Sequence, residues 1–153
     1  MLIAKDAEKL QQMLISWIID NATKFESRYG TELRAKPILI VSEKGHAEED
    51  TSGWRICDET YLDRIRECLD AAIEKLRKVP YTRRVSIPIW RPKDHLCNTP
   101  PAITEISFLF VDNKLHVTAF LRSLDALNYF KANFGLVSYV LEEIADKTGN
   151  VAG

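Results

Sequence analysis

Two β-rich runs joined by a two-residue turn constrain this chain more than any other feature. The runs are residues 103–111 (ITEISFLFV) and 114–122 (KLHVTAFLR), and Asp112 and Asn113 lie between them. Both runs are rich in β-branched and aromatic residues, which favour strands. Asp and Asn tolerate the backbone angles of a tight turn. The pattern therefore predicts an antiparallel hairpin.

Three longer segments carry apolar residues at helical spacing. They are residues 4–22, 59–78 and 134–147. We expect Asp58 to cap the second of these helices and Pro80 to mark its end. The third helix is expected to end near Gly149, because glycine adopts the left-handed conformation that closes many helices.

The remaining segments are short. We expect strands at residues 37–42 and 84–90, the second at a sheet edge or a bulge because it contains Pro88. Polar turn or loop structure is expected at residues 23–36, 43–53 and 91–101. Helices and strands in this mixed order predict an α+β fold rather than a regular βαβ alternation.

Composition and charge narrow the class of protein. Hydrophobic residues make up 46% and charged residues 28%, which is typical of a globular chain, and the length predicts a single domain over residues 1–153. A net charge of −1 gives no overall basic field to attract nucleic acid. No apolar run approaches the roughly 18 residues of a membrane span, and the first residues do not resemble a signal peptide. We therefore expect a cytoplasmic protein that binds neither nucleic acid nor membrane.

The number and spacing of the cysteines do not indicate a set of disulfide bonds. Cys57, Cys68 and Cys97 make an odd count with irregular gaps. We expect reduced thiols rather than disulfides, in keeping with a cytoplasmic location. The sequence has no CxxC motif and its histidines lack metal-ligand spacing, so we expect no metal site.

Several arginines stand at turns and strand ends, where they could hold an anion. Arg28 lies in the turn RYGT, Arg83 and Arg84 open a strand, and Arg122 and Ser123 close another. The planar guanidinium group donates paired hydrogen bonds to phosphate oxygens. Ordinary surface salt bridges are the alternative reading of the same residues.

A second polar group follows Arg122. Asn133, eleven residues later, offers one acceptor and two donors, so it could read a base edge that presents both kinds of group. The alternative is that Asn133 is a surface residue and that Ser123 or Asp125 caps a short helix at residues 123–130.

Several motifs together resemble the thymidylate synthase family, most of all its shorter archaeal branch. The motifs are RYGT, PYTRR, a proline pair before a strand, KLHVTAFLRSLD and GLVSYVLEEIADKTG. The resemblance runs from Arg28 to Gly149 and is strongest from Arg83 onward. The eleven residues from Arg122 to Asn133 match the spacing of the family's R-S-x-D…N segment.

The resemblance implies a fold, an assembly and a ligand. It implies an α+β fold around a large mixed sheet, a homodimer formed through that sheet, and binding of deoxyuridine monophosphate with a reduced folate or pterin one-carbon carrier. The phosphate-binding residues would be Arg28, Arg122 and Ser123 of one subunit and Arg83 and Arg84 of the other. Asp125 and Asn133 would contact the base or ribose.

The chain departs from the family at the nucleophile. The family has Pro-Cys-His or Pro-Cys-Leu, whereas this chain has Pro101-Ala102-Ile103, twenty residues before Arg122. A methyl group cannot attack C6 of a pyrimidine. Cys97 is a weak substitute, since misplacing a reacting group by about 1 Å costs on the order of a hundredfold in rate. By the same resemblance, the family's ribose-contacting and closing segments would follow residue 153, so we expect either a fragment or a shortened member of the family.

Three functions remain open from the sequence. The first is binding of a pyrimidine nucleoside monophosphate by a homodimer with shared arginines, without Cys-dependent methylation. The second is an active methyl or hydroxymethyl transfer to a pyrimidine nucleotide, which would need the one-carbon carrier. The third is a non-catalytic dimerisation or interaction module. The retained arginines favour the first function over the third, and the missing thiolate favours it over the second.

Overall fold

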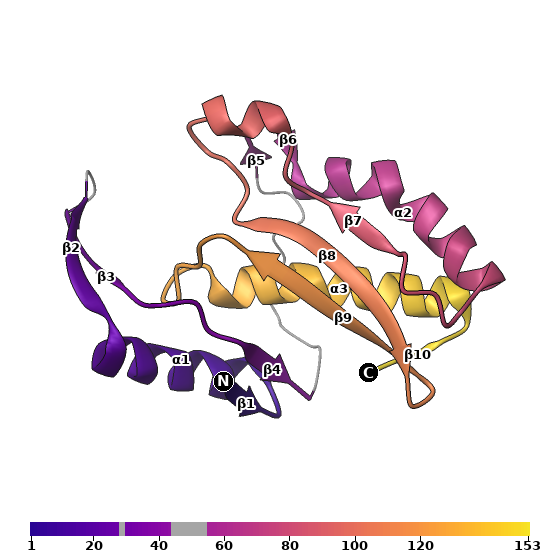
Figure 1. The fold of residues 1–153 in the computed structure, drawn as a ribbon, viewed down its shortest axis with the longest axis horizontal. Helices are drawn as coiled ribbons and strands as arrows, with labels where there is room; N and C mark the ends of the chain where they lie inside the picture. Colours follow the sequence, from indigo (N-terminus) through magenta and orange to yellow (C-terminus); the bar gives the residue numbers. More distant parts are fainter. Residues whose placement is uncertain (28–29, 44–54) are drawn as a thin grey trace.

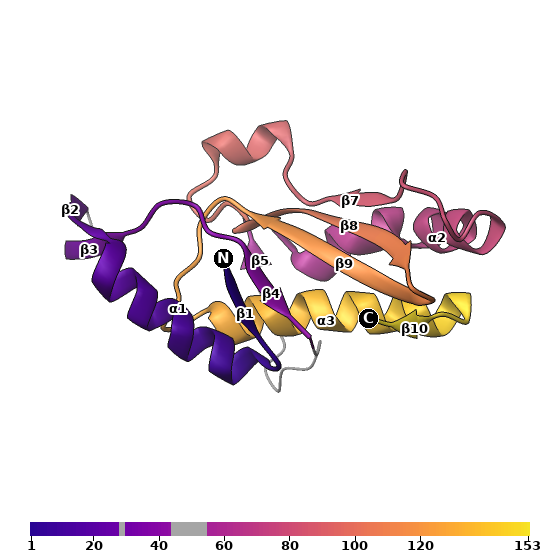
Figure 2. The same cartoon turned by 60° about the horizontal axis from the view of Figure 1, so that its bottom comes forward.

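A four-stranded sheet with two long helices against one face forms the centre of the structure (Figures 1 and 2). This computed structural model describes residues 1–27, 30–43 and 55–153. The strand order in the sheet is β10-β9-β8-β7. Helices and strands are mixed along the chain, so the α+β class expected from the sequence is confirmed.

The central hairpin is the one that the sequence predicts. Strands β8 (Ile103–Val111) and β9 (Lys114–Leu121) pair antiparallel along their length. Asp112 and Asn113 have φ angles of 50° and 61°, the left-handed conformation that a two-residue hairpin turn requires.

Short strands complete the two edges of this sheet. Strand β7 (Ser86–Pro88) pairs antiparallel with β8, and β10 (Val151–Ala152) pairs parallel with β9. Strand β7 is shorter than the expected 84–90, and Pro88 lies on this edge strand as expected, because it has no N–H to donate to a further strand.

Helices α2 (Tyr61–Lys78) and α3 (Phe130–Thr148) pack against the inner face of the sheet. Their buried side chains share one hydrophobic cluster with those of β7, β8 and β9. Gly149 closes α3 with a φ of 71°, which confirms the expected helix end. The other face of the sheet is covered by no element among the described residues (Figure 2).

The predicted cap of α2 is wrong. Thr60, not Asp58, is the N-cap residue. The Thr60 hydroxyl accepts from the Asp63 N–H, and the Asp63 carboxylate accepts from the Thr60 N–H. This reciprocal capping box satisfies two N–H groups at the helix start, whereas a cap at Asp58 would satisfy one.

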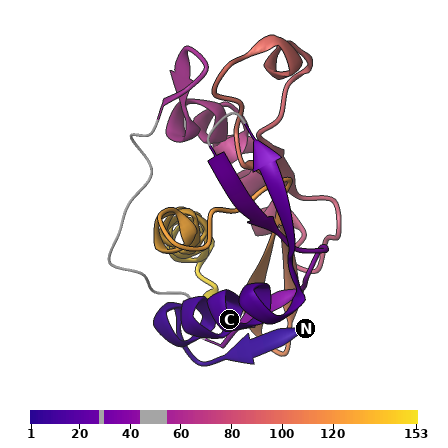
Figure 3. The ribbon, with the colours of Figure 1, turned by 90° about the vertical axis from the view of Figure 1, so that its left-hand side faces the viewer.

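A second, smaller core lies at the N-terminal end. Helix α1 (Ala7–Asn21) packs beside the parallel strands β1 (Leu2–Ala4) and β4 (Ile40–Ser42), of which β4 covers half of the expected 37–42 strand. This core includes Phe130, so α1 contacts the start of α3 (Figure 3).

The segment expected to be turn-like at residues 23–36 is instead a hairpin. Strands β2 (Thr23–Ser27) and β3 (Gly30–Arg34) pair antiparallel and stand at the end of α1 (Figures 1 and 3). Most of their side chains are exposed. No apolar alternation marks such strands in a sequence, which explains the wrong prediction.

The short helix expected at residues 123–130 is absent. The Asp125 carboxylate accepts hydrogen bonds from the N–H groups of Leu127 and Asn128, both at 3.0 Å, and holds this segment in turns. Regular helix begins only at Phe130, four residues before the expected start of α3.

The expectation of reduced thiols is also wrong for two of the three cysteines. Cys57 lies in the turn between β5 (Arg55–Ile56) and β6 (Glu59–Thr60), and it forms a disulfide with Cys97. Cys97 follows the 3₁₀ helix η1 (Pro92–Leu96) within the expected 91–101 loop. Forty residues separate the two cysteines, so only the folded chain brings their Cα atoms to 5.7 Å. Residues 44–53 of the expected acidic loop lie outside the described residues.

Candidate functional site

The candidate site is built around the start of strand β8. Ala102 is half-buried, and its N–H donates to the Tyr61 hydroxyl at 2.8 Å, while the Ile103 N–H donates to the same oxygen at 3.3 Å. Tyr61 is the first residue of α2 and is buried. Burial raises the pKa of Tyr61 above its usual value, although hydrogen bonds from Ile103 and Ala102 oppose the shift. A neutral phenol therefore holds the start of the strand.

Arg122 lies directly beside this strand start. The backbone N–H of Arg122 donates to the Ala102 carbonyl at 3.0 Å. Its guanidinium group donates through Nε to the Pro101 carbonyl at 2.8 Å and through Nη2 to the Pro100 carbonyl at 3.1 Å. The guanidinium carbon is 5.5 Å from the centre of the Trp90 ring.

The charge of Arg122 is left uncompensated by this arrangement. Its two hydrogen-bond partners are neutral carbonyls, and no acidic side chain forms an ion pair with it among the described residues. A guanidinium group has five N–H donors, and two of them are engaged by partners among the described residues. The remaining donors and the positive charge suit an anion.

Helix α3 begins at the end of the sheet where β9 ends (Figure 1), and Asn133 in its first turn carries an unused acceptor. Its side-chain amide donates to the Tyr129 carbonyl at 2.9 Å. Its Oδ1 atom is buried and has no hydrogen-bond partner among the described residues. A buried acceptor without a partner costs about 1–3 kcal/mol, so it points to a donor that the described residues do not supply.

Ser123 and Asp125, the other two residues predicted for the site after Arg122, lie in different surroundings. Ser123 is exposed next to Arg122. The Asp125 carboxylate instead accepts hydrogen bonds from its own loop, including one from the Asn128 side chain at 2.8 Å. Burial acts to raise the pKa of Asp125, but the hydrogen bonds from Asn128 and Leu127 outweigh it and lower the pKa. Asp125 therefore shapes the loop between β9 and α3.

Arg83 and Arg84 lie at the other end of the sheet. If the β7–β8 register is continued two residues beyond the start of β7, residue 84 falls beside residue 109, which is seven residues along β8 from Ala102. At 3.3 Å per residue this is roughly 23 Å, so these arginines do not meet Arg122 within one chain. Arg28 lies outside the described residues.

A buried ion cluster, which the sequence analysis did not predict, joins helix α2 to the segment that precedes strand β8. Arg64 of α2 is fully buried, and its guanidinium group contacts both carboxylate oxygens of Asp94, at 2.5 and 2.9 Å. Its Nε also donates to Glu59 at 2.9 Å. The hydrogen bonds from Arg64 lower the pKa of Asp94. The sequence could have indicated that Arg64 is buried, because Arg64 lies with Tyr61 and Ile65 on the apolar side of the helix. A buried arginine needs an acidic partner.

The nucleophile position and its proposed substitute both lack a free thiol. Ala102 has only a methyl side chain, and the Cys97 sulfur is bonded to Cys57. The described residues hold no group of three or more His, Cys, Asp or Glu side chains suited to a metal ion. In the same parts of the chain, no helix has the length and apolar character needed to cross a membrane.

Comparison with known proteins decides the family. Residues 5–153 match the sequence model of the family described as thymidylate synthase. The chain belongs to the thymidylate synthase family. The family resemblance read from the sequence motifs is thereby confirmed, and archaeal relatives agree with its archaeal branch.

Two archaeal proteins and one viral protein illustrate the likeness to thymidylate synthase. A putative thymidylate synthase of Methanosarcina barkeri is 35% identical over 101 residues, 61% of this chain and 46% of that protein. One of Methanosarcina mazei is 33% identical over 113 residues, 68% and 52% of the two chains. The thymidylate synthase of varicella-zoster virus is 26% identical over 144 residues, 88% and 46%. The chain thus spans about half the length of the curated relatives it matches.

Proposed function

We propose that this chain binds a pyrimidine nucleoside monophosphate, such as deoxyuridine monophosphate, without Cys-dependent methylation. The observation that carries the proposal is the guanidinium group of Arg122, which two neutral carbonyls fix in place beside Ala102. An arginine that is positioned but not neutralised is suited to a phosphate group. Family membership supports a nucleotide as the source of that phosphate.

Asn133 supports a pyrimidine as the base. Its Oδ1 atom needs a donor, and the N3–H of uracil would supply one once the covering atoms shift. Exposed Ser123 lies next to Arg122 and can add a hydroxyl donor to the same phosphate. Methylation that depends on a cysteine nucleophile is not expected, because Ala102 has no thiol and the Cys97 sulfur is bonded to Cys57.

Replacing Arg122 by alanine should weaken binding of deoxyuridine monophosphate by about 1.5–3 kcal/mol, the range for hydrogen bonds to a charged group. This corresponds to about a 10- to 150-fold rise in Kd, measured by isothermal titration calorimetry. Arg66→Ala, on the exposed side of α2, is the matched control and should bind as the wild type does. Equal affinity in Arg122→Ala and the wild type would refute the role of Arg122, and no binding by the wild type would refute the proposed function.

We also propose that the nucleotide site is shared between two copies of the chain. Arg83 and Arg84 are too far from Arg122 to contact one phosphate within a single chain. The uncovered face of the sheet carries exposed apolar side chains, with Leu109 43% and Phe120 53% exposed. A second copy packed on this face would cover them and could bring its arginines toward Arg122.

Light scattering at micromolar concentration should therefore give twice the 17.5 kDa mass of one chain. Phe120→Asp should yield monomers, because a charge on the uncovered sheet face resists burial. Ile19→Asp is the control, since Ile19 is 66% exposed on α1, away from that face. A monomeric wild type, or a dimer that Phe120→Asp does not weaken, would contradict dimerisation through the sheet.

A further inference from the structure

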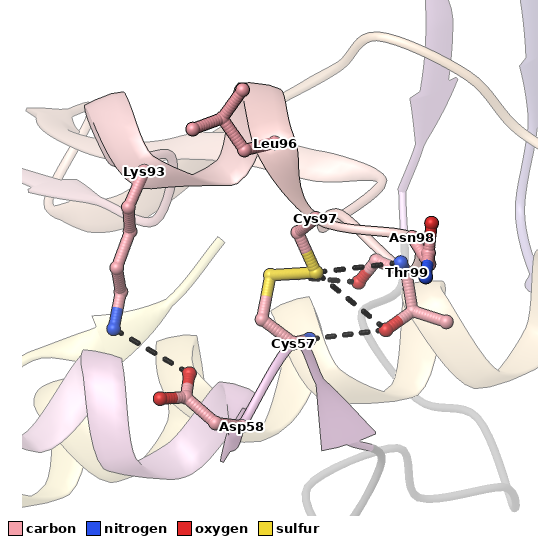
Figure 4. A pocket seen from close by; sticks show the side chains of 7 residues that line it. All are labelled: Cys57, Asp58, Lys93, Leu96, Cys97, Asn98 and Thr99. Carbon is pink, nitrogen blue, oxygen red and sulfur yellow. Dashed lines mark hydrogen bonds and ion pairs between the residues drawn. A yellow bond between two sulfur atoms is a disulfide. The ribbon is translucent and has the colours of Figure 1, made fainter.

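The Cys57–Cys97 disulfide lies in the wall of an open hollow of about 500 Å³ (Figure 4). The other residues that line the hollow are Asp58, Lys93, Leu96, Asn98 and Thr99. Both cysteines are only partly buried, so a small thiol can reach the bond from solvent. We propose that this pair is a reversible thiol–disulfide exchange site, and that its oxidised form clamps the loop that leads into strand β8.

The clamp joins two segments that support the start of β8. Cys57 has a φ of 58°, and its N–H donates to the Thr99 carbonyl at 3.1 Å and to the Thr99 hydroxyl at 3.2 Å. The disulfide adds a covalent link between the same two segments. Pro100 and Pro101, whose carbonyls hold Arg122, follow Thr99 directly. Releasing the bond should therefore loosen the loop that positions Arg122.

The surroundings of the two sulfur atoms differ in a way that directs the exchange. An Asp94 carboxylate oxygen lies 3.4 Å from the Cys57 sulfur, and as an acceptor it donates no hydrogen bond to a thiolate there. The Thr99 N–H donates to the Cys97 sulfur at 3.4 Å and favours a negative charge on that atom (Figure 4). The sulfur that better carries the charge is the better leaving group. Cys97 is therefore the leaving sulfur, and Cys57 is the one that an incoming thiolate attacks.

The reaction balances with a low-molecular-weight thiol as the reductant. Its thiolate bonds to the Cys57 sulfur, the Cys57–Cys97 bond breaks, and the Cys97 thiolate takes a proton from water. A second thiolate then attacks the reductant's sulfur in the mixed disulfide, which releases an oxidised low-molecular-weight disulfide and leaves the Cys57 thiolate to be protonated. The low-molecular-weight disulfide is the oxidant of the reverse reaction.

The test uses the full chain in buffers of reduced and oxidised glutathione, followed by trapping of free thiols with a maleimide. In Cys68→Ser, which removes the one free cysteine of the structure, two thiols should appear together as the buffer becomes reducing. The double variant Cys57→Ser/Cys68→Ser is the control: it keeps the single thiol of Cys97, which should be trapped in every buffer that contains only reduced glutathione. A Cys57–Cys97 pair that stays fully reduced in excess oxidised glutathione, or fully oxidised in excess reduced glutathione, would overturn the proposal.

Hydrogen exchange tests the clamp itself. On reduction, amide exchange in a peptide covering residues 97–103 should accelerate by at least about tenfold, while residues 106–110 of β8 should not change. Unchanged exchange at 97–103 would overturn the clamp.

Neither the trapping nor the exchange readout needs a nucleotide. The expected fall in nucleotide affinity on reduction does rest on the proposed function. If the chain bound no nucleotide in either redox state, the nucleotide proposal would fail, while the thiol and exchange data would still decide the clamp.

Discussion

Replacing Asp94 by alanine should lower the free energy of unfolding by about 3–5 kcal/mol, the usual cost of leaving one partner of a buried ion pair uncompensated. Asp94 accepts two hydrogen bonds from the buried guanidinium group of Arg64 and one from the Arg91 N–H at 2.8 Å. Without the carboxylate, the remaining acidic partner of Arg64 among the described residues is Glu59, whose side chain is partly exposed. Urea unfolding followed by circular dichroism measures the loss.

Two further variants separate the ion pair from the general effect of a substitution. Asp70→Ala removes an exposed carboxylate from the same helix as Arg64 and should change stability by less than about 0.5 kcal/mol. The double variant Arg64→Met with Asp94→Leu removes both charges and should recover much of the loss, because no uncompensated charge remains. Equal stability of Asp94→Ala and the wild type would contradict the ion pair.

The pH dependence of stability gives an independent check on Asp94. Arg64 lowers the pKa of Asp94 in the folded chain below its value in the unfolded chain. The stabilisation is therefore fully present above the unfolded pKa of about 4 and is lost as the pH falls through the lower folded value. The difference in stability between the wild type and Asp94→Ala should shrink in that acidic range.

The parts of the fold that the sequence predicts are those with a strong local pattern. The hairpin of residues 103–122 combines two apolar β-rich runs with an Asp-Asn turn, and α2 carries a continuous apolar stripe. Strands β2 and β3 have no such pattern, because most of their side chains face solvent. At residues 123–130, the Asp125 carboxylate competes for the N–H groups that would begin a helix, and the sequence does not show which use prevails.

The residues of the candidate site likewise fall into those that a local sequence pattern predicts and those that it does not. Ala102 and Arg122 could be placed together because they sit at the two ends of one predictable hairpin. Tyr61, Asp94 and the Cys57–Cys97 bond depend on contacts between segments about 30 to 40 residues apart in the chain. Such contacts follow from packing of the whole domain, and no local spacing predicts them.

Incubation of the wild-type chain with 5-tritiated deoxyuridine monophosphate should release no tritium above background, with or without a reduced one-carbon carrier. Release of the C5 hydrogen needs a nucleophile that adds to C6 of the pyrimidine and makes C5 carbanion-like. Ala102 offers only a methyl group at the position that matches the family nucleophile. The Cys97 sulfur is held in the disulfide with Cys57, so it provides no thiolate in the oxidised chain.

The same assay under reducing conditions tests whether Cys97 takes over. We expect no release from the reduced chain either, because Cys97 lies five residues before Ala102 and its sulfur faces the hollow beside Cys57 and Thr99 (Figure 4). Ala102→Cys provides the control for access: its thiol should react with a maleimide, as peptide mapping would show, since Ala102 is only half-buried. The contradicting result would be tritium release by the reduced wild type that is abolished in Cys97→Ser and kept in Cys68→Ser. It would identify Cys97 as the nucleophile and the chain as an enzyme.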